Sequence, residues 1–188
     1  GRAHSPEDIL RAWDLVEQAG FPVRNMDLIA GLPADSEEGF RDSLDRVVAL
    51  GPENITVHTL ALKKGSRLME EGGALPSGAD VGSMLDYAWS ALRAARQTPY
   101  YLYRQKYMAG NLENVGYCKP GTASIYNVDI MEEIMPIAAF GAGAISKWLY
   151  PAARRIERAP NVKNIEQYIA RVDEMAERKR ALWNEEGK

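Results

Sequence analysis

Residues 25–33 read Asn-Met-Asp-Leu-Ile-Ala-Gly-Leu-Pro, and this stretch decides the fold. Apolar residues typical of β-strands begin just upstream of it and continue through Ile29. The pattern ends at Gly31 and Pro33, two residue types that interrupt regular structure. A nearly continuous apolar run of this length between two helical patterns is typical of a buried parallel strand. The sequence therefore predicts a strand over residues 22–30.

Asp27 lies inside this apolar run. A carboxylate in a buried strand costs free energy unless a partner compensates its charge. Either local donors satisfy Asp27, or it faces a ligand beyond the carboxyl end of the strand, where parallel α/β folds bind their ligands. Residue type alone favours the first interpretation.

The sequence on both sides of this strand predicts a repeating α/β pattern. Ser5 and the proline after it are typical of a helix start, and apolar residues at helical spacing extend that helix over 5–19. A second helix is predicted over 36–50, and a second strand over 54–62. Two parallel strands joined by a right-handed crossover helix follow from this order.

The pattern changes after residue 79. Apolar residues at helical spacing predict a long helix, after which aromatic β-type segments alternate with glycines. The elements expected beyond the second strand are helices over 67–71, 80–97 and 162–183, and strands over 100–107, 115–118 and 154–158. We expect residues 99–158 to form a small, mostly antiparallel sheet, with the two longer helices packed against the α/β part.

Composition narrows the class of protein. The chain has 188 residues and a net charge of −3, which gives no reason to expect nucleic acid or an anionic membrane as a partner. No apolar run is long enough to span a membrane, so a cytoplasmic protein is expected. Cys118 is the single cysteine, which rules out an internal disulfide and a metal site of several cysteines. The chain begins at Gly1 without an initiator methionine, which indicates a piece of a longer protein.

Several motifs together carry a resemblance to a known family. They are GRAH at 1–4, NMDLIAGLP at 25–33, ITVHTLA at 55–61, YLYRQKY at 101–107, NVGYCKPG at 114–121 and GAGAIS at 141–146. In this order the motifs resemble the oxygen-independent coproporphyrinogen III oxidase family of the radical S-adenosylmethionine superfamily. Within that family, the residues of these motifs are most similar to those of the coproporphyrinogen dehydrogenase branch.

The resemblance implies a fold and a division into domains. The fold class is α/β: the C-terminal part of a (βα) partial TIM barrel, a small β-rich accessory region and a terminal helix. Residues 1–75 would be the C-terminal half of the radical S-adenosylmethionine barrel, and residues 76–188 the accessory domain. A half-barrel leaves one sheet edge unpaired, so we expect strand 22–30 at that edge and a possible homo-oligomer formed through it.

The resemblance also implies site residues. In the family, the arginine of the GRxH motif pairs with the carboxylate of S-adenosylmethionine, and Arg2 holds that position. The motif aspartate, here Asp27, accepts hydrogen bonds from the ribose hydroxyls. Ile29 lies on the same side of the strand as Asp27 and would contact the adenine, which Ala61 would approach with its backbone. For Ile29 and Ala61, ordinary core packing is the alternative.

The activity implied is the oxidative decarboxylation of coproporphyrinogen III to protoporphyrinogen IX, a step of haem biosynthesis. It requires S-adenosylmethionine and a 4Fe-4S cluster held by three closely spaced cysteines, which this chain does not contain. The sequence therefore assigns no catalytic residue and no metal ligand to this chain, and predicts that the isolated chain is inactive. Two alternatives stay open: a haem-trafficking protein of the same superfamily, and a non-catalytic interaction domain.

Three further features have competing interpretations. The aromatic residues of 100–107 indicate either an amphipathic edge strand or a wall for a flat tetrapyrrole, with Tyr101 and Tyr103 on one face. The glycines of 141–144 indicate a close backbone approach to a strand or ligand rather than a phosphate loop. His4 and His58 have no third ligand candidate nearby, so each is expected to be a hydrogen-bonded structural histidine.

Overall fold

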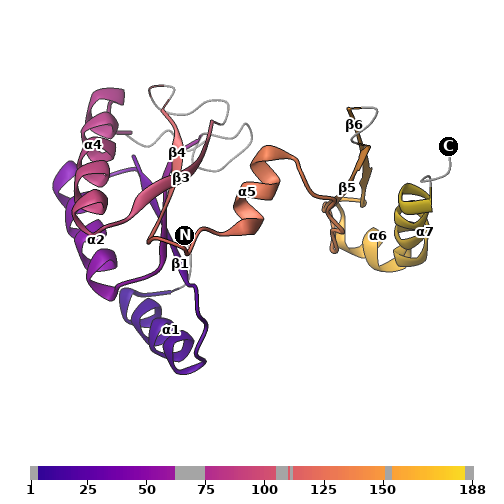
Figure 1. Ribbon diagram of the computed structural model, residues 1–188, viewed down its shortest axis with the longest axis horizontal. Coiled ribbons are helices and arrows are strands. Elements are labelled where there is room, and N and C mark those ends of the chain that lie inside the picture. The colour runs from indigo at the N-terminus through magenta and orange to yellow at the C-terminus, as the bar shows by residue number, and fades with distance from the viewer. Residues whose placement is uncertain (1–3, 62–74, 105–109, 111, 151–153, 185–188) are drawn as a thin grey trace. The chain divides into compact units, whose positions relative to one another are not determined.

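The structure is a computed structural model that describes residues 4–61, 75–104, 110, 112–150 and 154–184 (Figure 1). It divides the chain into two compact units, residues 1–124 and 125–188, and each is described here by itself. The division predicted at residue 75, between barrel and accessory domain, does not coincide with this one and stays a prediction. Predicted helix 67–71 lies outside the described residues.

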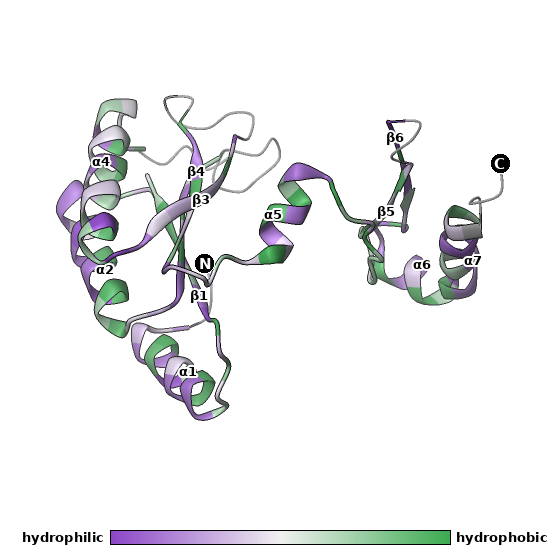
Figure 2. Ribbon diagram, in the orientation of Figure 1, coloured by the Kyte–Doolittle hydropathy of each residue, from purple (hydrophilic) through white to green (hydrophobic). Residues whose placement is uncertain are grey.

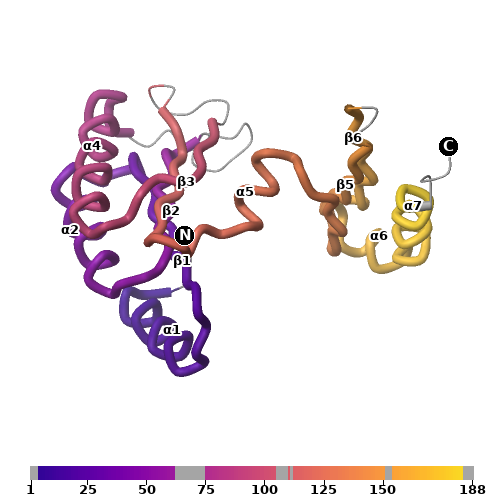
Figure 3. Tube along the Cα trace, viewed as in Figure 1, coloured from indigo at the N-terminus to yellow at the C-terminus, as the bar shows by residue number. Residues whose placement is uncertain are grey.

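The first unit contains one four-stranded sheet in the order β1-β2-β4-β3. Its strands are β1 (Asn25–Ala30), β2 (Asn54–Thr59), β3 (Thr98–Tyr103) and β4 (Asn114–Cys118). Its helices are α1 (Pro6–Gln18), α2 (Glu37–Leu50) and α4 (Gly78–Ala94). β1 and β2 are parallel, with α2 as their crossover, so the predicted α–β–α–β order is confirmed (Figure 3).

The prediction of a separate small sheet for the accessory strands is wrong. β4 pairs antiparallel with β2, and β3 pairs antiparallel with β4, so both strands extend the sheet that β1 and β2 begin. β2 is buried along nearly its whole length, and its backbone donors and acceptors need partners on both sides. β4 supplies that second side. The result is a mixed α/β sheet in one unit.

Helices α2 and α4 cover one face of this sheet. Their apolar sides meet β1, β2 and β4 in a single core made of Ala30, Phe40, Leu44, Ile55, Val57, Val81, Met84, Ala88, Leu92 and Tyr117. Both helices carry hydrophobic and hydrophilic residues along their length, as an amphipathic helix requires (Figure 2). Gly31 has φ +86°, and a Cβ there would lie 3.0 Å from the Val81 side chain, so glycine lets the chain turn beneath α4.

α1 is joined to the sheet by an ion-pair cluster at the start of the strands. The Arg24 guanidinium donates two hydrogen bonds to the Glu53 carboxylate, at 2.9 and 3.0 Å, and one to Glu17 of α1 at 2.9 Å. The same guanidinium lies over the Trp13 ring, 4.6 Å from its centroid. Arg24 therefore connects α1 to the segments that precede β1 and β2.

The second unit is built around an antiparallel hairpin of β5 (Ile145–Tyr150) and β6 (Arg155–Pro160). It also contains α5 (Ile125–Glu132), α6 (Ile165–Ala170) and α7 (Val172–Asn184). The single helix predicted over 162–183 is in fact two, because α6 ends at Ala170, with Arg171 as its C-cap, before α7 begins. α7 packs on β5 and β6, with Trp183 against Trp148 at 5.5 Å between ring centroids. The predicted packing of this helix against the α/β part stays a prediction.

The glycines of 141–144 form a close backbone contact, as predicted. Gly141 and Gly143 have φ of +99° and +72°, which favours glycine. The Gly143 N–H donates to the Val162 carbonyl at 2.8 Å, and the Asn161 amide donates to the Gly141 carbonyl at 2.8 Å. The Gly141 N–H donates to the Tyr168 hydroxyl oxygen at 3.1 Å. These bonds join the segment to its neighbours and occupy the N–H of both glycines.

Candidate functional site

β1 presents two different faces. Met26, Leu28 and Ala30 lie on the side of the core, whereas Asn25, Asp27 and Ile29 are exposed. The prediction that Asp27 and Ile29 lie on the same side is confirmed. The prediction that β1 is a buried strand is wrong for the described chain: helices cover one face only, and β1 is an edge strand. Its edge position agrees with the half-barrel expectation, and association through that edge stays a prediction.

The strand register places one row of residues across all four strands on the face that no described helix of this unit covers, called the uncovered face below. Asp27 is level with Thr56, Thr56 with Gly116, and Gly116 with Tyr101. In the adjacent row Ile29 is level with His58. A carboxylate, two hydroxyl groups, an imidazole and an aliphatic side chain therefore lie on one face of the sheet.

The ends of the first row, Asp27 and Tyr101, are 74 positions apart in the sequence. The sheet, rather than any local motif, therefore brings them onto one surface.

One chain of hydrogen bonds leads from Tyr101 to the first oxygen of Asp27. The Asn25 amide donates to Asp27 Oδ1 at 2.7 Å, and the Thr56 hydroxyl donates to Asn25 Oδ1 at 3.1 Å. Since the Thr56 proton is used in that bond, the Tyr101 hydroxyl, 3.3 Å away, is the donor to Thr56 Oγ1. Every donor in this chain is directed toward the carboxylate.

A second chain reaches the other oxygen of Asp27. His58 Nε2 lies 3.6 Å from Asp27 Oδ2, within ion-pair distance, and His58 Nδ1 lies 3.3 Å from the Tyr103 hydroxyl. The contact with His58, together with the Asn25 amide, lowers the pKa of Asp27 although partial burial acts in the opposite direction. The Asp27 side chain still exposes 59% of its surface, so it can accept further hydrogen bonds.

Gly116 makes room for the aromatic side of this face. The Tyr101 ring lies directly over Gly116, where a Cβ would stand 2.8 Å from Cζ and nearer still to Cδ1 and Cε1. The Tyr101 and Tyr103 rings are nearly parallel, at 9°, with centroids 6.3 Å apart. The prediction that these two tyrosines share a face is confirmed. Their strand, β3, lies at the edge of the sheet, which agrees with the interpretation of this segment as an amphipathic edge strand.

The remaining predicted site residues fall in different places. Ala61 is half-buried just beyond the carboxyl end of β2, where the Leu60 N–H donates to the Ala30 carbonyl at 3.0 Å. Arg2 lies outside the described residues, as do Gln105, Lys106 and Tyr107 of the aromatic segment. The structure therefore brings Asp27 and Ile29 together and leaves the role of each predicted residue as a proposal.

Sequence analysis missed the partners of Asp27. It treated His58 as an isolated structural histidine and assigned no partner to Tyr103 or Asn25. The signal that existed was the alternation along each strand, which puts Asn25 on the face of Asp27. Nothing local connects His58 with Tyr103, because their contact depends on how β2, β4 and β3 pair.

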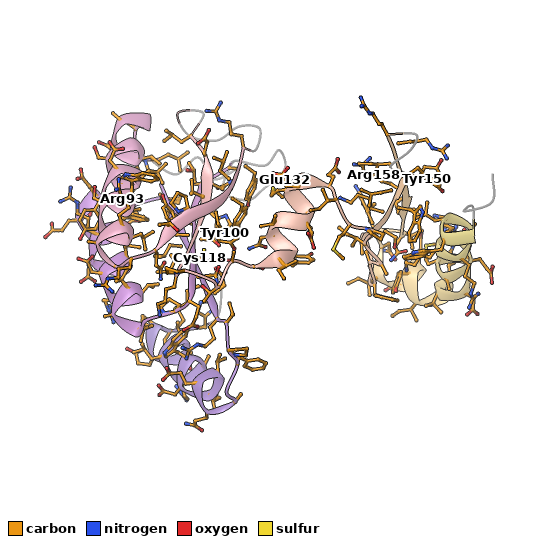
Figure 4. The ribbon with its side chains drawn as sticks, in the orientation of Figure 1. Arg93, Tyr100, Cys118, Glu132, Tyr150 and Arg158 are labelled. Atoms are coloured by element: carbon orange, nitrogen blue, oxygen red, sulfur yellow. The ribbon has the colours of Figure 1, made fainter. Side chains whose placement is uncertain are left out.

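The register places Cys118 on the same side of β4 as Gly116, level with Asn54 of β2 and Thr98 of β3. Cys118 lies at the end of β4 (Figure 4). The side chain is buried there, and burial raises the pKa of its thiol. Within the part of the chain that the structure describes, no three His, Cys, Asp or Glu side chains group as a metal site would require. None of the helices described there is long and apolar enough to cross a membrane.

Comparison with known proteins identifies the family. A scan against models of protein families finds no match. The chain is 39% identical over 181 residues to "Oxygen-independent coproporphyrinogen-III oxidase-like protein HemZ" of Bacillus subtilis, an alignment that covers 95% of this chain. The chain belongs to the oxygen-independent coproporphyrinogen III oxidase family. The family resemblance seen in the motifs is thereby confirmed.

The chain is also similar in sequence to heme chaperones. The chain is 25% identical over 154 residues to "Heme chaperone HemW" of Escherichia coli, covering 82% of this chain. A solved structure of coproporphyrinogen III oxidase (HemN) from Escherichia coli, described as a radical SAM enzyme, matches 92% of the chain with a TM-score of 0.64 at 21% identity. That match confirms the α/β fold class. The chain spans 36% and 37% of the two curated relatives and 39% of the solved chain.

Proposed function

We propose that this chain is the part of a radical S-adenosylmethionine coproporphyrinogen oxidase that binds the nucleoside of the cofactor. Asp27 accepts hydrogen bonds from the ribose hydroxyls, while Ile29 and the backbone at Ala61 contact the adenine. Arg2 pairs with the methionine carboxylate. The reaction is the oxidative decarboxylation of coproporphyrinogen III in haem biosynthesis, carried out in the cytoplasm by a longer protein.

The observation that carries the proposal is the setting of Asp27. A carboxylate with 59% of its side chain exposed lies beside Ile29, which is 41% exposed and on the same strand face. An acceptor pair next to an uncovered aliphatic side chain fits a ribose diol joined to an apolar base. Both oxygens of Asp27 already face a donor within the sheet, which favours the ionised form that accepts from hydroxyls.

The iron–sulfur cluster does not fit the residues of this chain. A cluster of this kind is held by several cysteine thiolates, and the chain has only Cys118. The proposed activity therefore requires cluster ligands from elsewhere in the longer protein, and the isolated chain is proposed to be inactive. When bound, S-adenosylmethionine supplies the oxidising chemistry, and this chain contributes binding and orientation.

Asp27→Ala in the full-length protein tests the proposal. We expect S-adenosylmethionine to bind about 30-fold more weakly, because roughly 2 kcal/mol of charge-assisted hydrogen bonding is lost. Isothermal titration calorimetry on the protein with its cluster measures this affinity. Asp42→Ala is the matched control, since Asp42 is an exposed carboxylate of α2 with 70% of its side chain accessible. Equal affinities for Asp27→Ala and wild type would remove Asp27 from the site.

Haem trafficking is the second candidate function, favoured by the similarity to heme chaperones. Here the stacked pair Tyr101 and Tyr103 would face haem rather than coproporphyrinogen. Titrating haem into the full-length protein distinguishes the two. A stable absorbance band that saturates at one haem per chain, without turnover of coproporphyrinogen III, would favour trafficking. Turnover without stoichiometric haem binding would favour the oxidase.

A further inference from the structure

The contacts that join Tyr103, His58 and Asp27 Oδ2 on the uncovered face have a defined donor-to-acceptor direction. An ionised carboxylate only accepts hydrogen bonds, so the 3.6 Å contact of His58 Nε2 with Asp27 Oδ2 favours the tautomer that carries the proton on Nε2. In the neutral ring Nδ1 is then an acceptor. The Tyr103 hydroxyl, 3.3 Å from Nδ1, is therefore the donor, and its proton points toward His58.

The rings themselves are held in place around this contact. His58 has 26% of its side chain exposed and meets the Tyr103 ring edge-on, at 70° with centroids 6.4 Å apart. Tyr103 is stacked in turn on Tyr101. The Tyr101 hydroxyl donates to Thr56 in the series of hydrogen bonds that leads to Asp27 Oδ1. Each carboxylate oxygen of Asp27 is thus approached by one donor from within the sheet, Asn25 at Oδ1 and His58 at Oδ2.

We propose that His58 and Tyr103 are positioning residues for Asp27. The Asp27 carboxylate sets the tautomer of His58, Tyr103 holds the ring in that orientation through Nδ1, and His58 fixes the second oxygen of the carboxylate. With one donor on each oxygen from the protein side, the remaining lone pairs of Asp27 face outward as a matched pair. That arrangement suits two neighbouring hydroxyls. The inference rests on the proposed function and extends it to two residues on other strands than Asp27.

Imidazole nitrogen spectra test the orientation without any ligand. The chain contains only two histidines, His4 and His58, so nitrogen-15 NMR resolves both rings. At a pH of about 8, where histidine is neutral, we expect His58 to be protonated at Nε2 with Nδ1 hydrogen-bonded. Tyr103→Phe should shift the Nδ1 signal toward that of a free acceptor, whereas Nε2 stays protonated because it still faces Asp27. A wild-type His58 protonated at Nδ1 would overturn the proposal.

Ligand affinity tests the consequence in the full-length protein, with S-adenosylhomocysteine as the probe. Tyr103→Phe keeps the ring and removes only the hydroxyl, and we expect affinity to fall about 3- to 10-fold. His58→Ala should lower the affinity at least as far. His58→Gln should restore most of that affinity, because an amide can also donate to Asp27. Tyr87→Phe is the control, since its hydroxyl bonds Asp45 on the helical side at 2.7 Å.

The outcomes separate this inference from the proposed function. If Asp27→Ala weakens binding while Tyr103→Phe and His58→Ala do not, the positioning role is wrong and the proposed function stands. If Asp27→Ala leaves affinity unchanged but Tyr103→Phe shifts the His58 Nδ1 signal as expected, the proposed ribose contact fails and the orientation of His58 toward Asp27 is retained.

Discussion

Glu53→Gln is expected to lower the free energy of unfolding of this protein by about 3 kcal/mol at neutral pH. The Glu53 carboxylate accepts three hydrogen bonds from Arg24, one from its backbone N–H at 3.0 Å and two from its guanidinium. Both side chains are largely buried, with 15% and 17% of their surface exposed. A neutral amide leaves the Arg24 charge in that setting without its main partner.

The effect has a definite pH dependence. The bonds from Arg24 lower the pKa of Glu53 from 4.5 to about 2. A carboxylate whose pKa is depressed in the folded state adds stability above its unfolded pKa, and this stability is lost as pH falls through the folded pKa. The difference between wild type and Glu53→Gln should therefore be largest above pH 4.5 and shrink between 4.5 and about 2.

Urea unfolding of both proteins over that pH range measures the difference. Glu17→Gln is the matched control, because Glu17 pairs with the same guanidinium but exposes 50% of its side chain. An exposed pair contributes little, so we expect at most about 1 kcal/mol there. Equal losses of unfolding free energy for the two variants would show that burial of Glu53 does not set the strength of its ion pair with Arg24.

Gly116→Ala should also destabilise the protein by about 3 kcal/mol, at the upper end of the range for overpacking. A Cβ at this position overlaps the Tyr101 ring, which cannot retreat without breaking its hydroxyl contact with Thr56 and its stack on Tyr103. We therefore expect lost stability together with a displaced Tyr101, visible as altered ring signals in proton NMR.

A double-mutant cycle identifies the cause. Tyr101→Ala removes the ring, so adding Gly116→Ala to it should cost far less than in wild type, and the two changes should not be additive. Gly82→Ala in α4 is the control, since nothing lies within 4 Å of a Cβ there and alanine favours a helix. Additive effects of Gly116→Ala and Tyr101→Ala would mean that the ring is not what glycine accommodates.

The sequence by itself determined the first half of the fold and one part of the site. The capping residue Ser5, the apolar run ending at Gly31 and the helical stripe of α2 are local signals, and each element formed within a few residues of its predicted bounds. Period-two alternation was enough to put Asp27 and Ile29 on one face. The motifs were enough to identify the family.

Only the tertiary structure decided how the later strands are used. A β-pattern predicts that a segment is a strand and which side chains share a face, but it does not name the neighbouring strand. β2 has two edges with backbone groups to satisfy, and β4, with β3 beyond it, pairs on the edge that β1 leaves open. That non-local choice places Tyr103 against His58 and Tyr101 over Gly116, and so surrounds Asp27 with partners that no sequence spacing reveals.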